Sequence, residues 1–150
     1  MNIFILNGPN LDKLGTREPA IYGTDTLAEV QSMCEKVGED IGLEIDFRQT
    51  NNEGELVGWL QEARKEASGV IINPAAFTHY SLAVRDALAA TELPAVEVHI
   101  SNIYAREEWR AKSVISGVVR AVIVGCGTQG YALAIEALTK ILSGQGQGEE

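Results

Sequence analysis

The stretch LVGWLQEARKEASGVII, residues 56–72, contains two hydrophobic patterns in succession. Four apolar residues recur in it at steps of three and four, namely Leu56, Leu60, Ala63 and Ala67. This spacing predicts a helix with a single apolar stripe. The run 69–72 that follows is typical of a short strand buried on both faces of a parallel sheet. A helix that leads directly into a buried strand predicts an α/β fold.

The same two patterns alternate along the rest of the chain. Further strands are expected at 3–6, 43–48, 95–100 and 118–124, and runs such as AVIV suit burial on both faces. Further helices are expected at 27–41, 81–90 and 131–142. Thr26 and Glu29 have the spacing of a capping box, and Gly42 is placed to end the first of these helices. The alternation predicts a five-stranded parallel sheet of order 2-1-3-4-5, in a flavodoxin-like doubly wound domain.

The length suits one domain, because 150 residues can bury about 68–70% of the unfolded surface. We expect residues 1–142 to form this domain. The segment SGQGQGEE, residues 143–150, lacks apolar side chains and is expected to be a disordered tail.

Composition and charge exclude several classes of protein. An apolar content of 45% and a charged content of 22% are those of an ordinary soluble globule. The net charge of −9 argues against binding to nucleic acid or to an anionic membrane surface. No apolar run approaches the roughly 20 residues of a membrane span. Cys34 and Cys126 have no metal-binding or CxxC spacing, so we expect buried free thiols in a cytoplasmic protein.

Polar and charged residues gather where the predicted strands end. Ligands of open α/β sheets bind outside the carboxyl ends of the strands, at the switch in strand order. The residues expected there are Asn7, Asn10, Arg17 and Tyr22 after the first strand, Asn73, Pro74, Thr78 and His79 after the third, and Glu97, His99, Ser101, Asn102, Arg106 and Arg110 on or after the fourth. Both histidines of the chain belong to this group, which favours a functional site over two ordinary surface histidines.

The segment EVHIS, residues 97–101, places three polar side chains on one face of a strand. A carboxylate beside an imidazole favours its protonated form and fixes its orientation. His99 with Glu97 is therefore a candidate proton donor, and an ordinary salt bridge at the end of a strand is the alternative.

A long loop, residues about 10–24, follows the first strand and has the length of a lid. Closing it would bring Arg17 and Tyr22 over the crevice. A guanidinium near the phenol would stabilise the phenolate, so the pair could abstract a proton. The alternative is that Tyr22 simply anchors the loop.

Two other motifs predict different chemistry. GCGTQG, residues 125–130, matches the dinucleotide-binding pattern, but no further βα unit follows, so a tight strand-to-helix turn is favoured. A hydrolase triad of Ser101, His99 and Asp86 lacks the G-x-S-x-G elbow. A signalling module of the response-regulator type would need clustered acidic residues after the first strand, where this chain has NGPNL. A flavodoxin-like nucleotide-binding or signalling module without catalysis stays as the alternative function.

Taken together, the segments NGPNL, GTREPAIYG, NNEGEL, NPAAFTHYS, EVHISN, REEWR and GCGTQGY resemble the type II 3-dehydroquinate dehydratases of the shikimate and quinate pathways. The resemblance covers nearly the whole chain. It implies a cofactor-free and metal-free lyase that performs an anti elimination of water from 3-dehydroquinate, through an enolate, to give 3-dehydroshikimate.

The resemblance also assigns roles to individual residues. It implies that Tyr22 is the base, activated by Arg17, that His99 is the acid, oriented by Glu97, and that Asn10 positions a water at the enolate oxygen. The residues implied to hold the substrate are Asn73, His79, Ile100, Ser101 and Arg110. Asp86 would reach the site of a neighbouring subunit in a homo-oligomer, commonly a dodecamer of four trimers.

Overall fold

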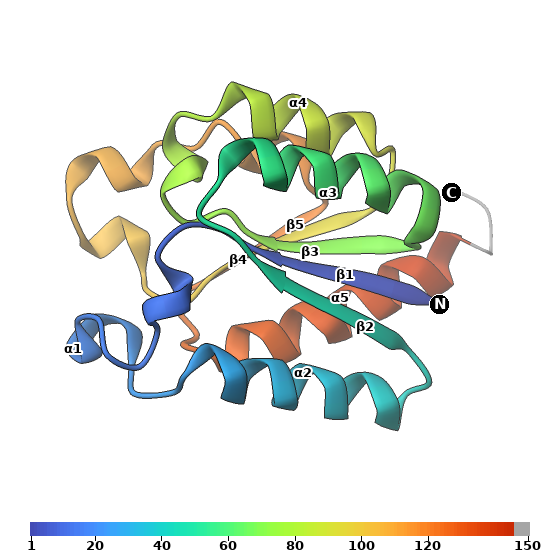
Figure 1. Ribbon diagram of the computed structural model, residues 1–150, viewed down its shortest axis with the longest axis horizontal. Helices are drawn as coiled ribbons and strands as arrows, with labels where there is room; N and C mark the ends of the chain where they lie inside the picture. The colour runs from blue at the N-terminus through green and yellow to red at the C-terminus, as the bar shows by residue number, and fades with distance from the viewer. Residues whose placement is uncertain (146–150) are drawn as a thin grey trace.

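Five parallel strands form one sheet in the order β2-β1-β3-β4-β5 (Figure 1). The computed structural model describes residues 1–145. The strands are β1 (Asn2–Asn7), β2 (Glu44–Gln49), β3 (Gly69–Asn73), β4 (Ala95–His99) and β5 (Ala121–Val124). Every neighbouring pair is parallel, so the predicted fold class and strand order are confirmed.

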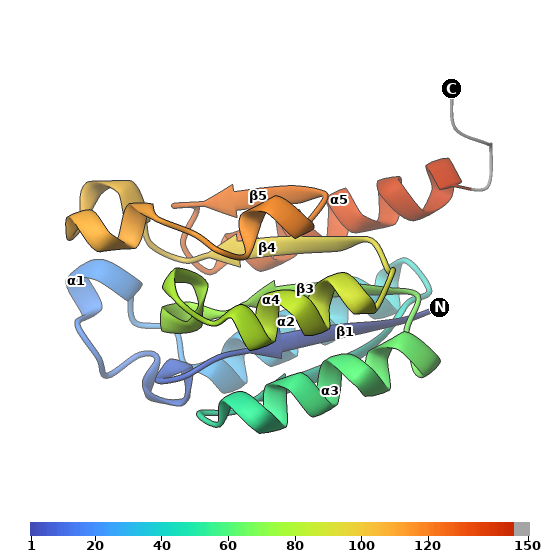
Figure 2. The same ribbon diagram turned by 90° about the horizontal axis from the view of Figure 1, so that it is seen from above.

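Helices cover both faces of the sheet and make three layers (Figure 1), and Figure 2 shows the sheet face-on with helices in front of it and behind it. The helices are α1 (Pro19–Tyr22), α2 (Leu27–Asp40), α3 (Glu53–Glu66), α4 (Leu82–Ala90) and α5 (Gln129–Gln145). α2 and α5 lie on one face, α3 and α4 on the other, and α1 stands beyond the end of the sheet (Figure 1). None of these helices, within the part of the chain that the structure describes, is long and apolar enough to cross a membrane.

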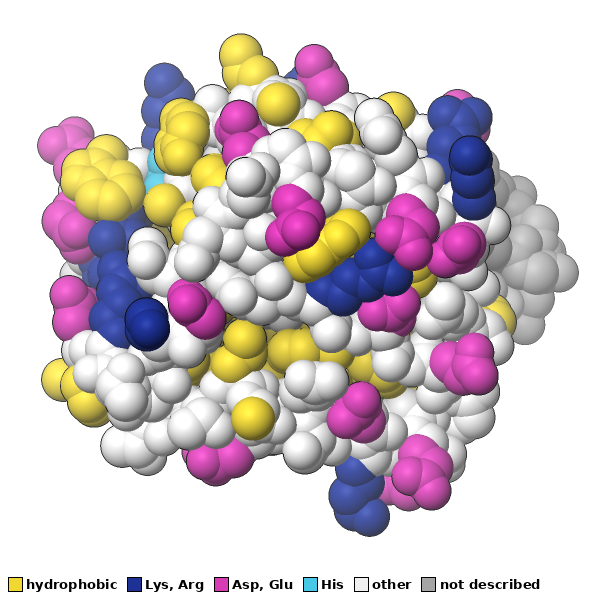
Figure 3. All heavy atoms as spheres, in the orientation of Figure 1, with side chains coloured by type: hydrophobic (Ala, Val, Ile, Leu, Met, Phe, Trp, Pro, Cys, Tyr) yellow, Lys and Arg dark blue, Asp and Glu magenta, His cyan; other side chains and the backbone are white. Residues whose placement is uncertain are grey.

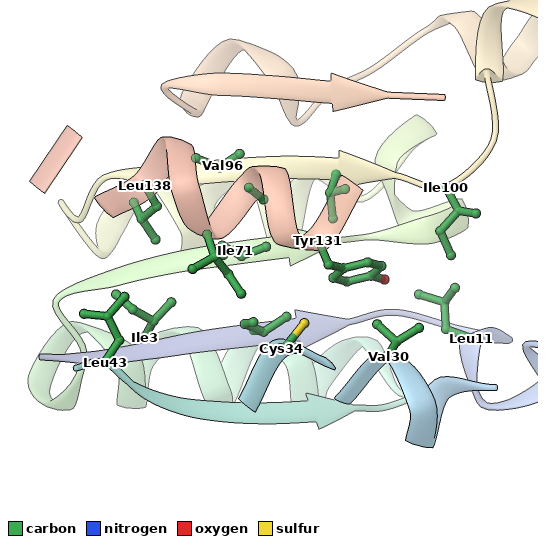
Figure 4. Close-up of a cluster of buried hydrophobic side chains, with 14 of the residues drawn as sticks. Ile3, Leu11, Val30, Cys34, Leu43, Ile71, Val96, Ile100, Tyr131 and Leu138 are labelled. Atoms are coloured by element: carbon green, nitrogen blue, oxygen red, sulfur yellow. The ribbon is translucent and has the colours of Figure 1, made fainter. Parts of the chain in front are cut away.

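A cluster of buried apolar side chains fills each space between sheet and helices. Figure 4 shows the cluster under α2 and α5, where Ile3 and Ile71 of the sheet meet Cys34 of α2 and Leu138 of α5. Each fully buried side chain of this size contributes about 1.5–3 kcal/mol relative to an exposed one. The apolar stripes read from the sequence are therefore the surfaces that hold the helices on the sheet.

The start and end of α2 follow from local chemistry. The Thr26 side chain accepts a hydrogen bond from the Glu29 backbone N–H at 3.2 Å, as the capping-box spacing predicts. α2 ends at Asp40, and Gly42 has a φ of +77°, a conformation that favours glycine.

The prediction of a strand at 118–124 is wrong for its first three residues. Residues Ser116–Val118 form a 3₁₀ turn, and β5 begins only at Ala121. AVIV is also not buried on both faces, because β5 is an edge strand with a neighbour on one side only, and Val122 is 40% exposed. The second and fourth strands differ from the expected bounds by one residue, since they are Glu44–Gln49 and Ala95–His99.

Two expectations near the C-terminus need correction. Cys34 is buried as expected, but Cys126 is exposed, because it lies in the turn between β5 and α5. Burial raises the pKa of the Cys34 thiol to about 12. The last helix continues to Gln145, so the first three residues of the expected tail 143–150 are helical. Residues 146–150 of that tail lie outside the described residues.

The ends of β1 and β3 meet closely at the switch in strand order. Asn7 and Asn73 are register partners in the parallel pair. Gly8 follows, and a Cβ at this position would lie 2.5 Å from the Pro74 carbonyl oxygen, so only glycine fits. The loops after both strands therefore leave the sheet in contact with each other, at the switch in strand order where ligands of such folds bind.

Candidate active site

A cleft lies at the carboxyl ends of β1, β3 and β4, where the sequence predicts it. All of the residues with a predicted catalytic or binding role except Glu97 and Asp86 line it, namely Asn10, Arg17, Tyr22, Asn73, His79, His99, Ile100, Ser101 and Arg110. Lys and Arg side chains gather over this edge, at the left of Figure 3. A chain of net charge −9 therefore concentrates cations where it could receive an anion.

His99 and Glu97 form a buried pair at the end of β4. Their side chains share one strand face, and the solvent-exposed fractions of the two residues are 4% and 0%. His99 Nε2 is hydrogen-bonded to Glu97 Oε2. The imidazole therefore has Nδ1 left for a group in the cleft.

Ser116 completes the surroundings of the Glu97 carboxylate. Its Oγ donates a hydrogen bond to Glu97 Oε1 at 2.8 Å and lies 2.9 Å from Ser113 Oγ. Both carboxylate oxygens thus have a partner, which a buried charge requires. Ser116 is absent from the predicted site, and no motif marks it, because it lies in the irregular stretch before β5.

Two guanidinium groups lie beside the Tyr22 ring. Arg17 Cζ is 4.9 Å from the ring centroid and Arg106 Cζ is 5.0 Å from it. The Arg106 side chain is only 11% exposed, and its Nη1 donates to Ser101 Oγ at 3.1 Å. Its Nε has no hydrogen-bond partner among the described residues. This concentration of positive charge favours an anionic oxygen in the cleft.

Arg106 was placed at the crevice by the sequence but was not among the predicted catalytic or binding residues. The available signal is its position in REEWR, residues 106–110, seven residues after His99 at the end of β4. Its contact with Tyr22 depends on how the loop 10–24 folds over the sheet, which no local pattern specifies.

His79 also lines the cleft, and it comes from a different element, the 3₁₀ turn Ala75–His79. Its Nδ1–H donates to the Lys112 carbonyl oxygen at 2.7 Å, and its ring meets the Trp109 ring edge-to-face at 5.3 Å. Burial lowers the pKa of His79 below its usual value. Electrostatic interactions with His99 and Arg110 act in the same direction, and the hydrogen bond to Lys112 opposes them. The neutral ring then presents Nε2 as a hydrogen-bond acceptor.

Arg110 and Asn73 bring a cation and an amide to the cleft. Arg110 Nε donates to Glu107 Oε2 at 3.0 Å, and its Cζ lies 4.2 Å from the Trp109 ring centroid. Asn73 is 3% exposed and donates from Nδ2 to the Tyr131 hydroxyl at 3.0 Å. Both side chains are therefore held by neighbours, as groups that orient a ligand need to be.

Asn10 is the most exposed of the predicted residues in the first loop. It has a φ of +69°, and its backbone N–H donates to Asn51 Oδ1 at 2.9 Å. Its left-handed conformation is one that asparagine tolerates better than most residues. The side chain is part of the lining of the cleft.

Asp86 does not join the cleft of its own chain. Its side chain is 77% exposed on α4 and lies 3.4 Å from Arg85. The hydrolase triad is therefore not assembled, because the carboxylate that contacts His99 belongs to Glu97.

GCGTQG, residues 125–130, forms the turn from β5 into α5 and does not line the cleft. Gly125 and Gly127 have φ values of +86° and +62°, and their N–H groups donate to the His99 and Ile100 carbonyl oxygens at 3.1 and 3.0 Å. The glycines thus serve a tight turn against the end of β4. Within residues 1–145, no group of three His, Cys, Asp or Glu side chains could hold a metal ion.

Comparisons with known proteins agree with one another. A profile of the family described as Dehydroquinase class II matches residues 1–139. The 3-dehydroquinate dehydratase of Rhizobium meliloti (strain 1021) is 53% identical over 139 residues, which is 93% of this chain and 94% of that protein. That of Salinispora tropica is 53% identical over 138 residues, 92% of this chain and 96% of that protein.

Solved structures show the same similarity in three dimensions. The type II dehydroquinase from Propionibacterium acnes superposes with a TM-score of 0.88 at 45% identity, over 95% of this chain and 96% of that one. The type II dehydroquinase from Butyrivibrio crossotus gives a TM-score of 0.91 at 42% identity, over 93% of this chain and 97% of that one.

Proposed function

Because the chain belongs to the class II dehydroquinase family and is a 3-dehydroquinate dehydratase, a hydro-lyase, we propose that this cleft carries out the elimination of water from 3-dehydroquinate. The observation that supports the site best is the convergence of a tyrosine, two arginines and a carboxylate-bound histidine in one cleft. Removing a proton next to a ketone and expelling a β-hydroxyl requires a base, a stabiliser of the enolate and an acid. The cleft supplies a group for each.

Tyr22 is the proposed base. Its phenolate oxygen takes the proton from C2, and the electron pair of the C2–H bond passes to the C3 carbonyl oxygen to form the enolate. Arg17 and Arg106, each about 5 Å from the ring centroid, stabilise negative charge on the phenolate before the transfer. Asn10 positions a water against the enolate oxygen.

His99 is the proposed acid. As the enolate collapses, the C3 carbonyl and a C1–C2 double bond form, the C1–O bond breaks, and the proton of Nδ1 moves to the departing oxygen to give water. Glu97 supports this step, since its carboxylate holds Nε2 and balances the charge of the imidazolium. Ser116 in turn orients the carboxylate.

The remaining polar groups hold the substrate. Arg110 is the cation suited to its carboxylate, and the neutral His79 accepts a hydrogen bond from one of its hydroxyls. Asn73 and the Ile100–Ser101 segment supply further donors and acceptors. A rigid set of contacts of this kind orders the substrate before the proton transfers begin.

A homo-oligomer, a dodecamer of four trimers, is the proposed assembly. Asp86 is exposed and lies outside its own cleft, and two large apolar side chains of the same region, Tyr80 and Leu82, are 61% and 62% exposed. Exposed apolar side chains next to each other are typical of contact surfaces. Asp86 would reach the cleft of the neighbouring subunit. Free thiols suit the cytoplasm, where we place the enzyme.

The test is to incubate the purified protein with 3-dehydroquinate and to follow the ultraviolet absorbance of the conjugated enone that elimination creates. The expected result is a steady rise that is proportional to enzyme concentration. Binding of substrate without any enone would overturn the assignment of the reaction to this cleft.

A further inference from the structure

The mechanism leaves one buried phenol of the core without a role. Tyr131, at the start of α5, is fully buried, and its hydroxyl lies between two asparagines. It donates to Asn7 Oδ1 at 2.7 Å and accepts from Asn73 Nδ2 at 3.0 Å. Figure 4 shows the oxygen of Tyr131 at the end of the core where Leu11 and Ile100, two residues of the cleft, lie.

The two asparagines are the last residues of β1 and β3 and register partners at the switch in strand order. Asn73 lines the cleft. A buried hydroxyl at this point costs free energy unless both of its neighbours are hydrogen-bonding groups. A phenylalanine would fill the same volume without that cost, so packing alone does not account for the oxygen.

The hydrogen bonds through Asn7, Tyr131 and Asn73 form a series, and a backbone group at each end of the series sets the donor and acceptor of every one of them. At one end the Arg48 carbonyl can only accept, so Asn7 must present Nδ2 to it, at 3.0 Å. Asn7 Oδ1 then faces Tyr131, whose hydroxyl must donate to it and accept from Asn73. At the other end the Ala75 N–H can only donate, and it reaches Asn73 Oδ1 at 3.2 Å.

An Asn73 amide with its oxygen and nitrogen exchanged is therefore excluded by two contacts, one with the Ala75 N–H and one with the Tyr131 hydroxyl. It would set an NH₂ group against the Ala75 N–H and an oxygen against a hydroxyl whose proton is already given to Asn7. The orientation that survives leaves one N–H and one lone pair of the Asn73 amide for the cleft.

We propose that Tyr131 is a positioning residue for the substrate site, because its hydroxyl, held between Asn7 and Asn73, fixes the Asn73 amide in the orientation that receives substrate. This inference rests on the proposed function, in which Asn73 holds 3-dehydroquinate. Tyr131 touches no substrate and acts through Asn73 alone.

The test compares the steady-state kinetics and melting temperatures of four variants. Tyr131→Phe should raise KM roughly fivefold and change kcat much less, as expected for one lost hydrogen bond in the bound state. Asn73→Ala should raise KM at least as much. The double variant should have the KM of Asn73→Ala, because Tyr131 has nothing left to orient.

Leu138→Val is the matched control. Leu138 is buried in the same core and lies on the same helix. It packs against Gly69, the first residue of β3, so it is at the end of the strand away from Asn73. It should lower the melting temperature and leave KM unchanged. If Tyr131→Phe behaved in the same way, or if the effects on KM were additive in the double variant, Tyr131 would be an ordinary core residue.

Two further outcomes separate this inference from the proposed function. An unchanged KM in Asn73→Ala would overturn the positioning role together with the binding role of Asn73, whereas the enone assay tests the reaction itself. If Tyr131→Phe does not fold, amide exchange in wild-type protein labelled with ¹⁵N-asparagine decides the matter, with Asn73→Ala identifying the signal. Slow exchange of an Asn73 side-chain proton supports the proposal that the Tyr131 hydroxyl fixes this amide. Exchange at the rate of an exposed asparagine overturns the proposal.

Discussion

Replacing Tyr22 by Phe removes one oxygen from the cleft, and we expect the variant to lose nearly all turnover while the fold and substrate binding survive. The ring keeps its contacts with the Arg17 and Arg106 guanidinium groups, whose Cζ atoms are 4.9 and 5.0 Å from its centroid. Both contacts involve the ring face, which Phe also presents. The free energy of unfolding should therefore change by no more than about 0.5 kcal/mol.

The size of the kinetic effect follows from the role of the oxygen. A positioned general base contributes roughly 10²–10⁴ in rate. Its loss should therefore raise the barrier by about 3–5 kcal/mol. Because the groups proposed to hold the substrate remain, KM should stay near its wild-type value, and kcat and kcat/KM should fall together.

The assay is the initial rate of enone absorbance at several substrate concentrations. Tyr104→Phe is the matched control, since Tyr104 is 63% exposed and outside the residues that line the cleft. It should keep full activity. A Tyr22→Phe enzyme that retained more than roughly a tenth of wild-type kcat would remove Tyr22 from the base role, given the contribution expected of a general base.

Three other outcomes are expected. In His99→Ala, kcat should fall by roughly 10²–10⁴, as expected for the loss of a general acid. His79→Ala should mainly raise KM. The same kinetic pattern in both variants would contradict this division of roles. Burial lowers the pKa of His79 below its usual 6.5, so the unfolded chain takes up its proton first as pH falls, and stability is lost below about pH 6.5. The melting temperature of His79→Gln should accordingly fall less than that of the wild type between about pH 7.5 and about pH 5.5, and an equal fall would show that His79 does not contribute. Asp86→Ala should raise KM and shift the light-scattering mass to smaller species, and a variant unchanged in both measurements would rule out the shared site.

Much of the site could be predicted because the fold brings strand ends together. Once a parallel sheet of order 2-1-3-4-5 is expected, any residue directly after β1, β3 or β4 must lie near the same crevice. His99 and Asn73 are placed in this way with no information beyond their position in the chain. The pairing of His99 with Glu97 follows from the alternation of side chains along a strand.

The contacts that hold these residues could not be predicted. Tyr131 meets Asn7 across a sequence separation of 124 residues, and Ser116 reaches Glu97 from an irregular segment with no periodic pattern. Arg106 lies beside Tyr22 only because the loop that carries α1 folds over the cleft. The burial of AVIV was overestimated for a related reason, since the composition of a strand does not say whether it lies at the edge of the sheet.

The sequence by itself determined the order of helices and strands, the parallel sheet and the edge at which the chemistry gathers, because hydrophobic periodicity and strand-end position are local properties. Only the tertiary structure decided which groups pair across the cleft and which way each amide points. Those choices depend on contacts between residues far apart in the chain, such as Asn73 with Tyr131, Glu97 with Ser116 and Tyr22 with Arg106. Such contacts are set by how α5, the segment before β5 and the loop 10–24 pack on the sheet.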